Sequence, residues 1–158
     1  MTLRSTAAAA LFVTLALTVP SLASAQIPDS VIPLQTVISE TNRFRAEYAD
    51  HFNKKDVAGL MTLYAADAIF TAEDGTRYTG KEAISAYFTK MVPTMPHIVV
   101  TSESLLSYGG TAIDMGTITM HPPAGGEMKS RYLAVLRREL GGAGNWDLIR
   151  VARTPVTK

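Results

Sequence analysis

The chain has 158 residues, of which 47% are hydrophobic and 18% are charged, a composition typical of one globular domain and not of a disordered segment. It carries 15 basic and 14 acidic residues, so no strong basic field is available to attract nucleic acid or an acidic membrane. The absence of cysteine excludes disulfides, thiol catalysis and cysteine-ligated zinc.

The N-terminal segment has the organisation of a secretory signal peptide. Arg4 supplies a positive charge, residues 7–19 form an apolar run, and small residues end at Ala25. The alternative is a membrane anchor, but the apolar run is shorter than the roughly 20 residues that a spanning helix needs. We therefore expect a signal peptide over residues 1–25 and a secreted or periplasmic protein without membrane attachment. Residues 26–33, the first residues after the expected cleavage, are expected to form a flexible arm.

Helical periodicity covers most of the segment that follows. Residues 34–54 place side chains at intervals of three and four, which predicts an amphipathic helix with one buried stripe: Val37, Thr41, Phe44, Tyr48 and Phe52. Asp56 is a suitable N-cap for a second helix over residues 57–65. Gly80 precedes a third helix over residues 81–92, which the following proline ends.

The remaining segments read as strands. Two short strands are predicted at residues 69–72 and 77–79, on either side of a turn, and four long strands follow the third helix: residues 97–108, 111–121, 127–140 and 146–153. Helices first and strands after predict an α+β fold, in which three N-terminal helices pack on one face of a curved, mostly antiparallel sheet. We expect a single domain over residues 34–154 and a C-terminal tail of residues 155–158.

Several short motifs occur in the order of a known superfamily: Asn53–Asp56, Leu63–Ala68, Gly80–Ile84, Arg131–Leu133 and Trp146. Over about residues 36–153 the chain resembles the nuclear-transport-factor-two-like superfamily, in its SnoaL-like and ketosteroid-isomerase-like branch. The resemblance implies a cone-shaped, cystatin-like α+β barrel with a conical pocket between sheet and helices, often in a homodimer. It implies no particular reaction, because this fold hosts isomerases, cyclases, dehydratases and non-catalytic domains.

The residue pattern of the ketosteroid isomerases is present only in part. In those enzymes a helix tyrosine donates a hydrogen bond to the substrate oxyanion, and Tyr48 matches its place. The alternative is that Tyr48 is one more member of the buried stripe. The place of the catalytic base is held by Ala72, and the neighbouring Glu73 would point away from the pocket unless the strand register slips. No acid occurs in residues 131–136, where the second donor of that family would fall.

SnoaL-type cyclases use a histidine and an aspartate in the pocket, for which Asp114, His97 and His121 are the candidates here. If Asp114 faces the pocket, its burial would suit it to act as a general base, and if it faces water it is a plain surface acid. We expect His121 to be exposed and His51 to lie at the helix surface. The three histidines show no metal-binding spacing, so we expect no metal and no cofactor.

Three functional hypotheses follow from these residues. The first is a domain that binds a small hydrophobic molecule, with walls formed by Phe44, Tyr48, Phe52, Phe70, Tyr87, Met115, Tyr132 and Trp146. The second is an acid–base enzyme of the isomerase or cyclase kind, with Tyr48 as the oxyanion donor and Asp114 or Glu73 as the base. The third is a structural homodimer module that makes its contact through the outer face of the sheet.

Overall fold

The computed structural model describes residues 32–139 and 145–156. The expected signal peptide and nearly all of the expected N-terminal arm lie outside these described residues. None of the helices in the two described ranges is both long and apolar enough to cross a membrane.

The first helix, α1, spans Leu34–Asn53 and follows the predicted pattern closely. Its buried residues are the five members of the predicted stripe: Val37, Thr41, Phe44, Tyr48 and Phe52. The stripe packs into the core, while the charged side chains of the helix lie mainly on its other faces. The predicted helix and its buried side are therefore confirmed.

The second helix, α2, spans Val57–Thr62 and is shorter than predicted. Asp56 caps its N-terminus as expected, because the Asp56 carboxylate accepts a hydrogen bond from the backbone N–H of Gly59 at 2.9 Å. The helix was predicted to continue to residue 65, but strand β1, Tyr64–Thr71, begins in its place. The backbone N–H of Leu148 donates to the carbonyl of Leu63 at 2.8 Å, so pairing with a distant strand overrides local helix propensity.

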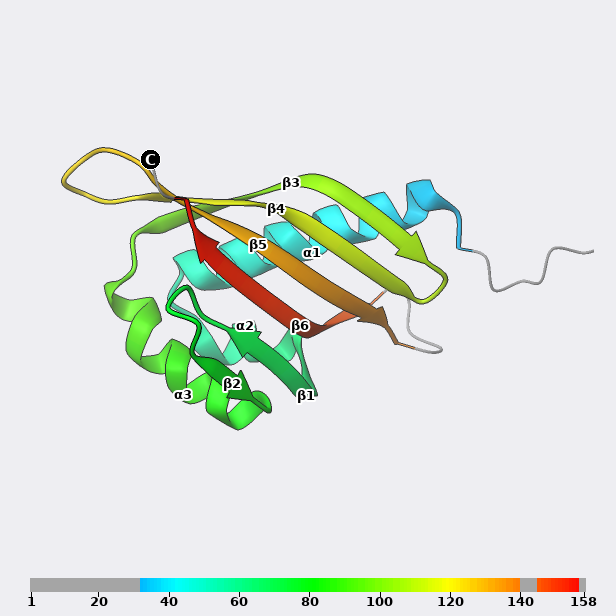
Figure 1. The fold of residues 1–158 in the computed structure, drawn as a ribbon, viewed down its shortest axis with the longest axis horizontal. Helices are drawn as coiled ribbons and strands as arrows, with labels where there is room; N and C mark the ends of the chain where they lie inside the picture. Colours follow the sequence, from blue (N-terminus) through cyan, green and yellow to red (C-terminus); the bar gives the residue numbers. More distant parts are fainter. Residues whose placement is uncertain (1–31, 140–144, 157–158) are drawn as a thin grey trace, which may run out of the picture.

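The third helix, α3, spans Lys81–Met91 and ends in a short 3₁₀ turn, η1, over Val92–Thr94. It follows strand β2, Arg77–Thr79. Gly80 connects the strand to the helix with a φ of 83°, a conformation that suits glycine. Figure 1 shows α3 lying beside β1 and β2, and α1 crossing one face of the longer strands.

The long strands are β3 (His97–Tyr108), β4 (Thr111–His121), β5 (Met128–Arg138) and β6 (Trp146–Pro155). They form the predicted antiparallel meander, and β1 then pairs with β6 in parallel, giving one open sheet of order β2-β1-β6-β5-β4-β3. The helices cover one face of this curved sheet (Figure 1). The predicted α+β architecture is confirmed, and the parallel pairing is the feature that the sequence pattern did not predict.

Side chains of β4 and β5 alternate strictly between the two faces of the sheet. On β4, Asp114 and Ile118 are buried beneath the helices, while Ile113 and Met115 lie on the outer face and are half-buried. Strand β5 buries Tyr132, Ala134 and Leu136 in the same way. Alternation therefore directs Asp114 inward and Met115 outward, so the two residues cannot line the same pocket.

A β-bulge in β3 opposite Gly116 depends on the absence of a side chain there. The register between β3 and β4 shifts between Ser102 and Ser104. A Cβ on Gly116 would lie 1.9 Å from the backbone carbonyl oxygen of Thr101, a distance that no real contact allows. The bulge therefore requires glycine at this position of β4.

Gly116→Ala should lower the free energy of unfolding by about 3 kcal/mol, at the upper end of the range for overpacking. Gly110→Ala is the matched control, because a Cβ on Gly110 meets nothing within 4 Å. Its effect should stay within about 0.5 kcal/mol. Urea unfolding of both variants measures the difference, and equal stabilities would contradict the assigned role of the bulge.

Candidate functional site

A small cavity lies between α1 and the buried face of the sheet. We call it the inner cavity, and its volume is about 40 Å³, which is room for a few water molecules and not for a steroid-sized body. Most of its walls are apolar, and its polar groups come from six residues: Arg45, Tyr48, Tyr64, Asp114, Tyr132 and Arg153.

Two phenols face this space from different elements, Tyr48 from α1 and Tyr64 from β1. Both side chains are buried, and burial raises the pKa of each above its usual value of 10. Within the described ranges, the Tyr64 hydroxyl has no partner in hydrogen-bond geometry, although the neighbouring Tyr48 phenol contributes to the rise of its pKa. A buried hydroxyl without a partner is costly, so the Tyr64 hydroxyl is a donor available to a guest.

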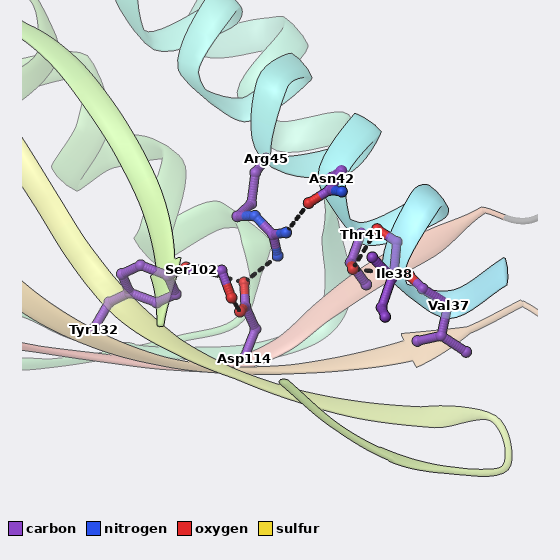
Figure 2. A network of polar contacts seen from close by, with 8 residues as sticks. All are labelled: Val37, Ile38, Thr41, Asn42, Arg45, Ser102, Asp114 and Tyr132. Atoms are coloured by element: carbon purple, nitrogen blue, oxygen red, sulfur yellow. Dashed lines mark hydrogen bonds and ion pairs between the residues drawn. The ribbon is translucent and has the colours of Figure 1, made fainter. Parts of the chain in front are cut away.

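The Asp114 carboxylate is the most heavily bonded group of the cavity (Figure 2). It accepts hydrogen bonds from Arg45 at 2.7 Å, from the hydroxyl of Ser102 at 2.5 Å and from the hydroxyl of Tyr132 at 3.0 Å. Asp114 is only 2% exposed, so of the two alternatives for this residue the structure favours the pocket-facing one. Its two oxygens nevertheless accept from three donors, so a substrate would have to displace one of them to reach the carboxylate.

The Tyr132 phenol is held as a donor by this arrangement. Burial and the neighbouring Asp114 carboxylate together raise the pKa of Tyr132 well above its usual value. Tyr132 therefore stays protonated at any physiological pH and serves to fix the position of Asp114.

A second and larger hollow opens at the surface between β2, α3 and the turn after β1. We call it the outer depression, and its volume is about 660 Å³. The rings of Tyr78 and Tyr87 lie along it, tilted by 35° with centroids 4.5 Å apart. The other wall residues are partly small or apolar (Ala72, Ala83, Ala86, Met91 and Met95) and partly charged (Glu73, Asp74, Lys90 and Arg153). Its volume lies within the range of small-molecule sites.

Arg153 on β6 lines both the inner cavity and the outer depression. One of its terminal nitrogens donates to the carboxylate of Glu73 at 2.7 Å and to the hydroxyl of Ser130 at 2.9 Å. The side chain is 4% exposed, whereas that of Glu73 is 34% exposed. The Arg153 Nε has no hydrogen-bond partner among the described residues. Glu73, predicted as a catalytic base, therefore lies at the boundary between the two spaces as an ion-pair partner.

The structure brings some of the predicted wall residues together and separates the others. Phe44, Tyr48 and Tyr132 line the inner cavity, and Tyr87 lines the outer depression. Phe52 and Phe70 are packed in the core, with 2% and 0% exposure, and reach neither space. Met115 lies on the outer face of the sheet, for the reason given above.

The histidines lie away from Asp114. His97 and His121 pair with each other at the far ends of β3 and β4, and both are exposed, whereas Asp114 pairs with Leu105. His51 contacts the Asp56 carboxylate at 2.8 Å, next to the start of α2. Among the described residues, no group of three or more histidines and acids is placed to hold a metal ion.

Two arginines of the site were not among the predicted residues. Arg45 lies outside the predicted buried stripe of α1, but its long side chain reaches Asp114 at 2.7 Å. Arg153 shares a face with Val151, two residues earlier on β6, and this period-two relation was the available signal.

Trp146, predicted to line the pocket, lies instead in a structural contact with Glu40 on α1. The Glu40 carboxylate accepts hydrogen bonds from Arg138 at 2.9 Å and from the Trp146 indole at 2.8 Å. Burial would raise the pKa of Glu40, but these hydrogen bonds and the charges of Arg138 and Arg43 outweigh burial, so the pKa falls below its usual 4.5.

A folded-state pKa below the unfolded value means that Glu40 stabilises the fold above its unfolded pKa and loses this effect as pH falls through its folded pKa. Glu40→Gln should therefore flatten the loss of unfolding free energy between about pH 5 and pH 3. Urea titrations across this range measure the slope. Asp50→Asn, which removes an exposed acid paired with Lys54 on the same helix, is the control. Parallel slopes for Glu40→Gln and wild type would contradict the assignment.

Comparison with known families gives one clear match. A family model described as a SnoaL-like domain matches residues 45–143 of the chain. No curated protein matches it significantly.

Solved structures match over nearly their whole length. A candidate dehydratase of the NTF2-like family from Streptomyces avermitilis is 15% identical, with a TM-score of 0.64, 78% of this chain covered and 99% of that chain. A candidate aromatic ring hydroxylase from Novosphingobium aromaticivorans is 18% identical, with a TM-score of 0.63 and coverages of 81% and 94%. An uncharacterised protein with a cystatin-like fold from Caulobacter vibrioides is 15% identical, with a TM-score of 0.64 and coverages of 76% and 89%. At such identities these likenesses establish the fold alone.

Proposed function

This chain belongs to the SnoaL-like domain family, and we propose that it is an exported domain that binds a small apolar or aromatic molecule. The observation that carries the proposal is the outer depression, whose 660 Å³ and paired tyrosine rings suit such a body. Arg153 lines both spaces, so we propose that one end of the ligand reaches the inner cavity, which holds only about 40 Å³, while the rest lies in the outer depression.

The Tyr48 and Tyr64 phenols are the donors that an entering polar end would meet. Both are buried, and the Tyr64 hydroxyl has no partner among the described residues, so a ligand oxygen would satisfy it. Phenols in an apolar wall with a few polar groups orient a ligand without binding it covalently.

A ligand-shift thermal melt of the purified protein tests the proposal, with steroids, polyketide-like aromatics and fatty acids as the panel. We expect at least one class to raise the melting temperature, and Tyr87→Ala and Tyr48→Phe to reduce the shift. Tyr108→Ala, at an exposed position outside both spaces, is the control for loss of aromatic area. Shifts that survive Tyr87→Ala unchanged would place the ligand elsewhere.

An acid–base enzyme of the isomerase or cyclase kind is the second candidate. It is favoured by one observation, that Asp114 and Tyr48 lie in the walls of the same cavity. In that case Tyr48 is the oxyanion donor, and the base is Asp114, freed from Arg45, or Glu73. Exchange of α-protons of a bound ketone for deuterium, followed by NMR, should then be lost in Asp114→Asn or Glu73→Gln. No exchange in the wild-type protein with a bound ketone would reject this candidate.

We also propose a homodimer that forms through the outer face of the sheet. Two rows of apolar side chains lie there in register, Leu106–Ile113–Val135 and Met115–Leu133–Ala152. Leu133 is 42% exposed, which is unusual for a leucine in a central strand. Light scattering on wild type and Leu133→Glu should give a dimer and a monomer, respectively, and a monomeric wild type would contradict the proposal.

Export is proposed from the N-terminal sequence. Mass spectrometry of the protein recovered outside the cytoplasm should give a chain starting at Gln26. A full-length chain in the cytoplasm would contradict it.

A further inference from the structure

Arg153 is a buried cation in the wall shared by two spaces. It lines the inner cavity and the outer depression, and its side chain is 4% exposed. A buried guanidinium needs a counter-charge and filled donors, because an uncompensated charge in the interior is costly. The groups that satisfy Arg153 therefore decide what the site accepts.

The counter-charge comes from Glu73, which belongs to the turn after β1 and not to a strand. Its carboxylate contacts Arg153 at 2.7 Å, yet the Glu73 side chain is 34% exposed and borders the outer depression. Glu73 can therefore turn to water when another anion takes its place beside Arg153, whereas Arg153 cannot leave its place in β6. The ion pair has one fixed partner and one exchangeable partner.

Two buried donors at this place have no acceptor in the described part of the chain. Within the described ranges, the Arg153 Nε and the Tyr64 hydroxyl are buried without a partner. Burial raises the pKa of three tyrosines, Tyr48, Tyr64 and Tyr87. The positive charge of Arg153 opposes this rise in each of them, because the guanidinium lies close to all three phenols. The arrangement offers a positive charge and several donors to one incoming acceptor.

Building on the proposed function, we propose that the ligand carries a carboxylate, which binds Arg153 in place of Glu73, while its aromatic body lies against Tyr78 and Tyr87. A carboxylate fits the planar fork of arginine with two parallel hydrogen bonds, which would engage the Nε that Glu73 leaves free. Exchange of one carboxylate for another keeps Arg153 neutralised throughout. The volumes agree with this division, since the small cavity admits a head group and the depression admits a ring system.

Calorimetric titration with 2-naphthoate and its neutral analogue 2-naphthamide tests the proposal on the purified protein. We expect 2-naphthoate to bind at least about tenfold more tightly, because the charged acceptor forms the stronger hydrogen bonds. Glu73→Gln should increase the affinity for 2-naphthoate, since it removes the competing carboxylate. Arg153→Met should abolish the preference for 2-naphthoate over 2-naphthamide. The double variant Glu73→Gln/Arg153→Met should abolish it too, and it removes both partners of the ion pair, so neither charge is left unpaired.

Arg150→Gln, which removes an exposed arginine of the same strand, is the control and should keep the preference for 2-naphthoate. Lys90→Gln tests the alternative that the lysine in the wall of the outer depression supplies the charge. A preference that survives the double variant, or that vanishes in Lys90→Gln alone, would overturn the assignment to Arg153.

The two proposals fail in different ways. If 2-naphthamide and 2-naphthoate bind equally and Tyr87→Ala weakens both, the binding function stands and the carboxylate inference is wrong. If neither compound nor any member of the thermal-melt panel binds, the proposed function fails and the inference fails with it.

Discussion

Replacing Asp114 by alanine should lower the free energy of unfolding by about 3–5 kcal/mol. The carboxylate is 3% exposed, and its removal leaves the guanidinium of Arg45 and the hydroxyls of Ser102 and Tyr132 without their acceptor. Each of these donors was desolvated to form the network shown in Figure 2, so the cost is that of several unpaired groups and not of one contact.

Two further variants separate charge from shape. Asp114→Asn keeps the volume of the side chain and one acceptor oxygen, and should cost about 1–3 kcal/mol. Arg45→Met/Asp114→Leu removes both partners of the ion pair and should be less damaging than Asp114→Ala alone. Chemical denaturation of the four proteins gives the comparison. If Asp114→Ala unfolds at the wild-type urea concentration, the network contributes nothing to the stability.

Phe70→Ala should lower the free energy of unfolding by about 3–5 kcal/mol and also impair ligand binding. Phe70 is fully buried in β1, and its ring lies 5.2 Å from that of Phe88 and 5.3 Å from that of Tyr87. Truncation therefore opens a hole beneath the ring that forms one wall of the outer depression.

The matched control is Tyr108→Ala on β3, where an aromatic side chain is 65% exposed. It should change the unfolding free energy by no more than about 0.5 kcal/mol. Thermal and urea unfolding measure the stabilities, and the ligand-shift melt measures the second effect. A stable Phe70→Ala variant that no longer binds would show that Phe70 touches the ligand directly, against its placement in the core.

Periodicity in the sequence predicted the elements that local pattern determines. The stripe of α1 and the bounds of β3 and β4 match the structure residue by residue. These segments obey one period each, 3.6 or 2, and their turns carry glycine. The superfamily resemblance, confirmed by the family match, supplied the architecture that assembles them.

The remaining features depend on contacts between distant segments. Tyr64 reads as helix from its neighbours, and it becomes strand because β6 is available to pair with it. The roles of Arg45 and Arg153 follow from the partners that the fold brings to them, Asp114 and Glu73. Local pattern cannot report such partners. The exclusion of Met115 from any pocket that Asp114 faces was, by contrast, already implied by strand alternation.

The position of β6 between β1 and β5 bears on how the chain acquires its structure. Strands β3 to β6 can pair by successive hairpins, whereas the pairing of Phe70 with Val151 joins segments from opposite ends of the domain. Such non-local pairing is slow to form, because loop closure must be completed before the contact stabilises it. A chain that has not yet gained residues 146–155 therefore cannot close its core. Until β6 pairs with both of its neighbours, β1 and β2 stay separate from the part of the sheet that β3, β4 and β5 form.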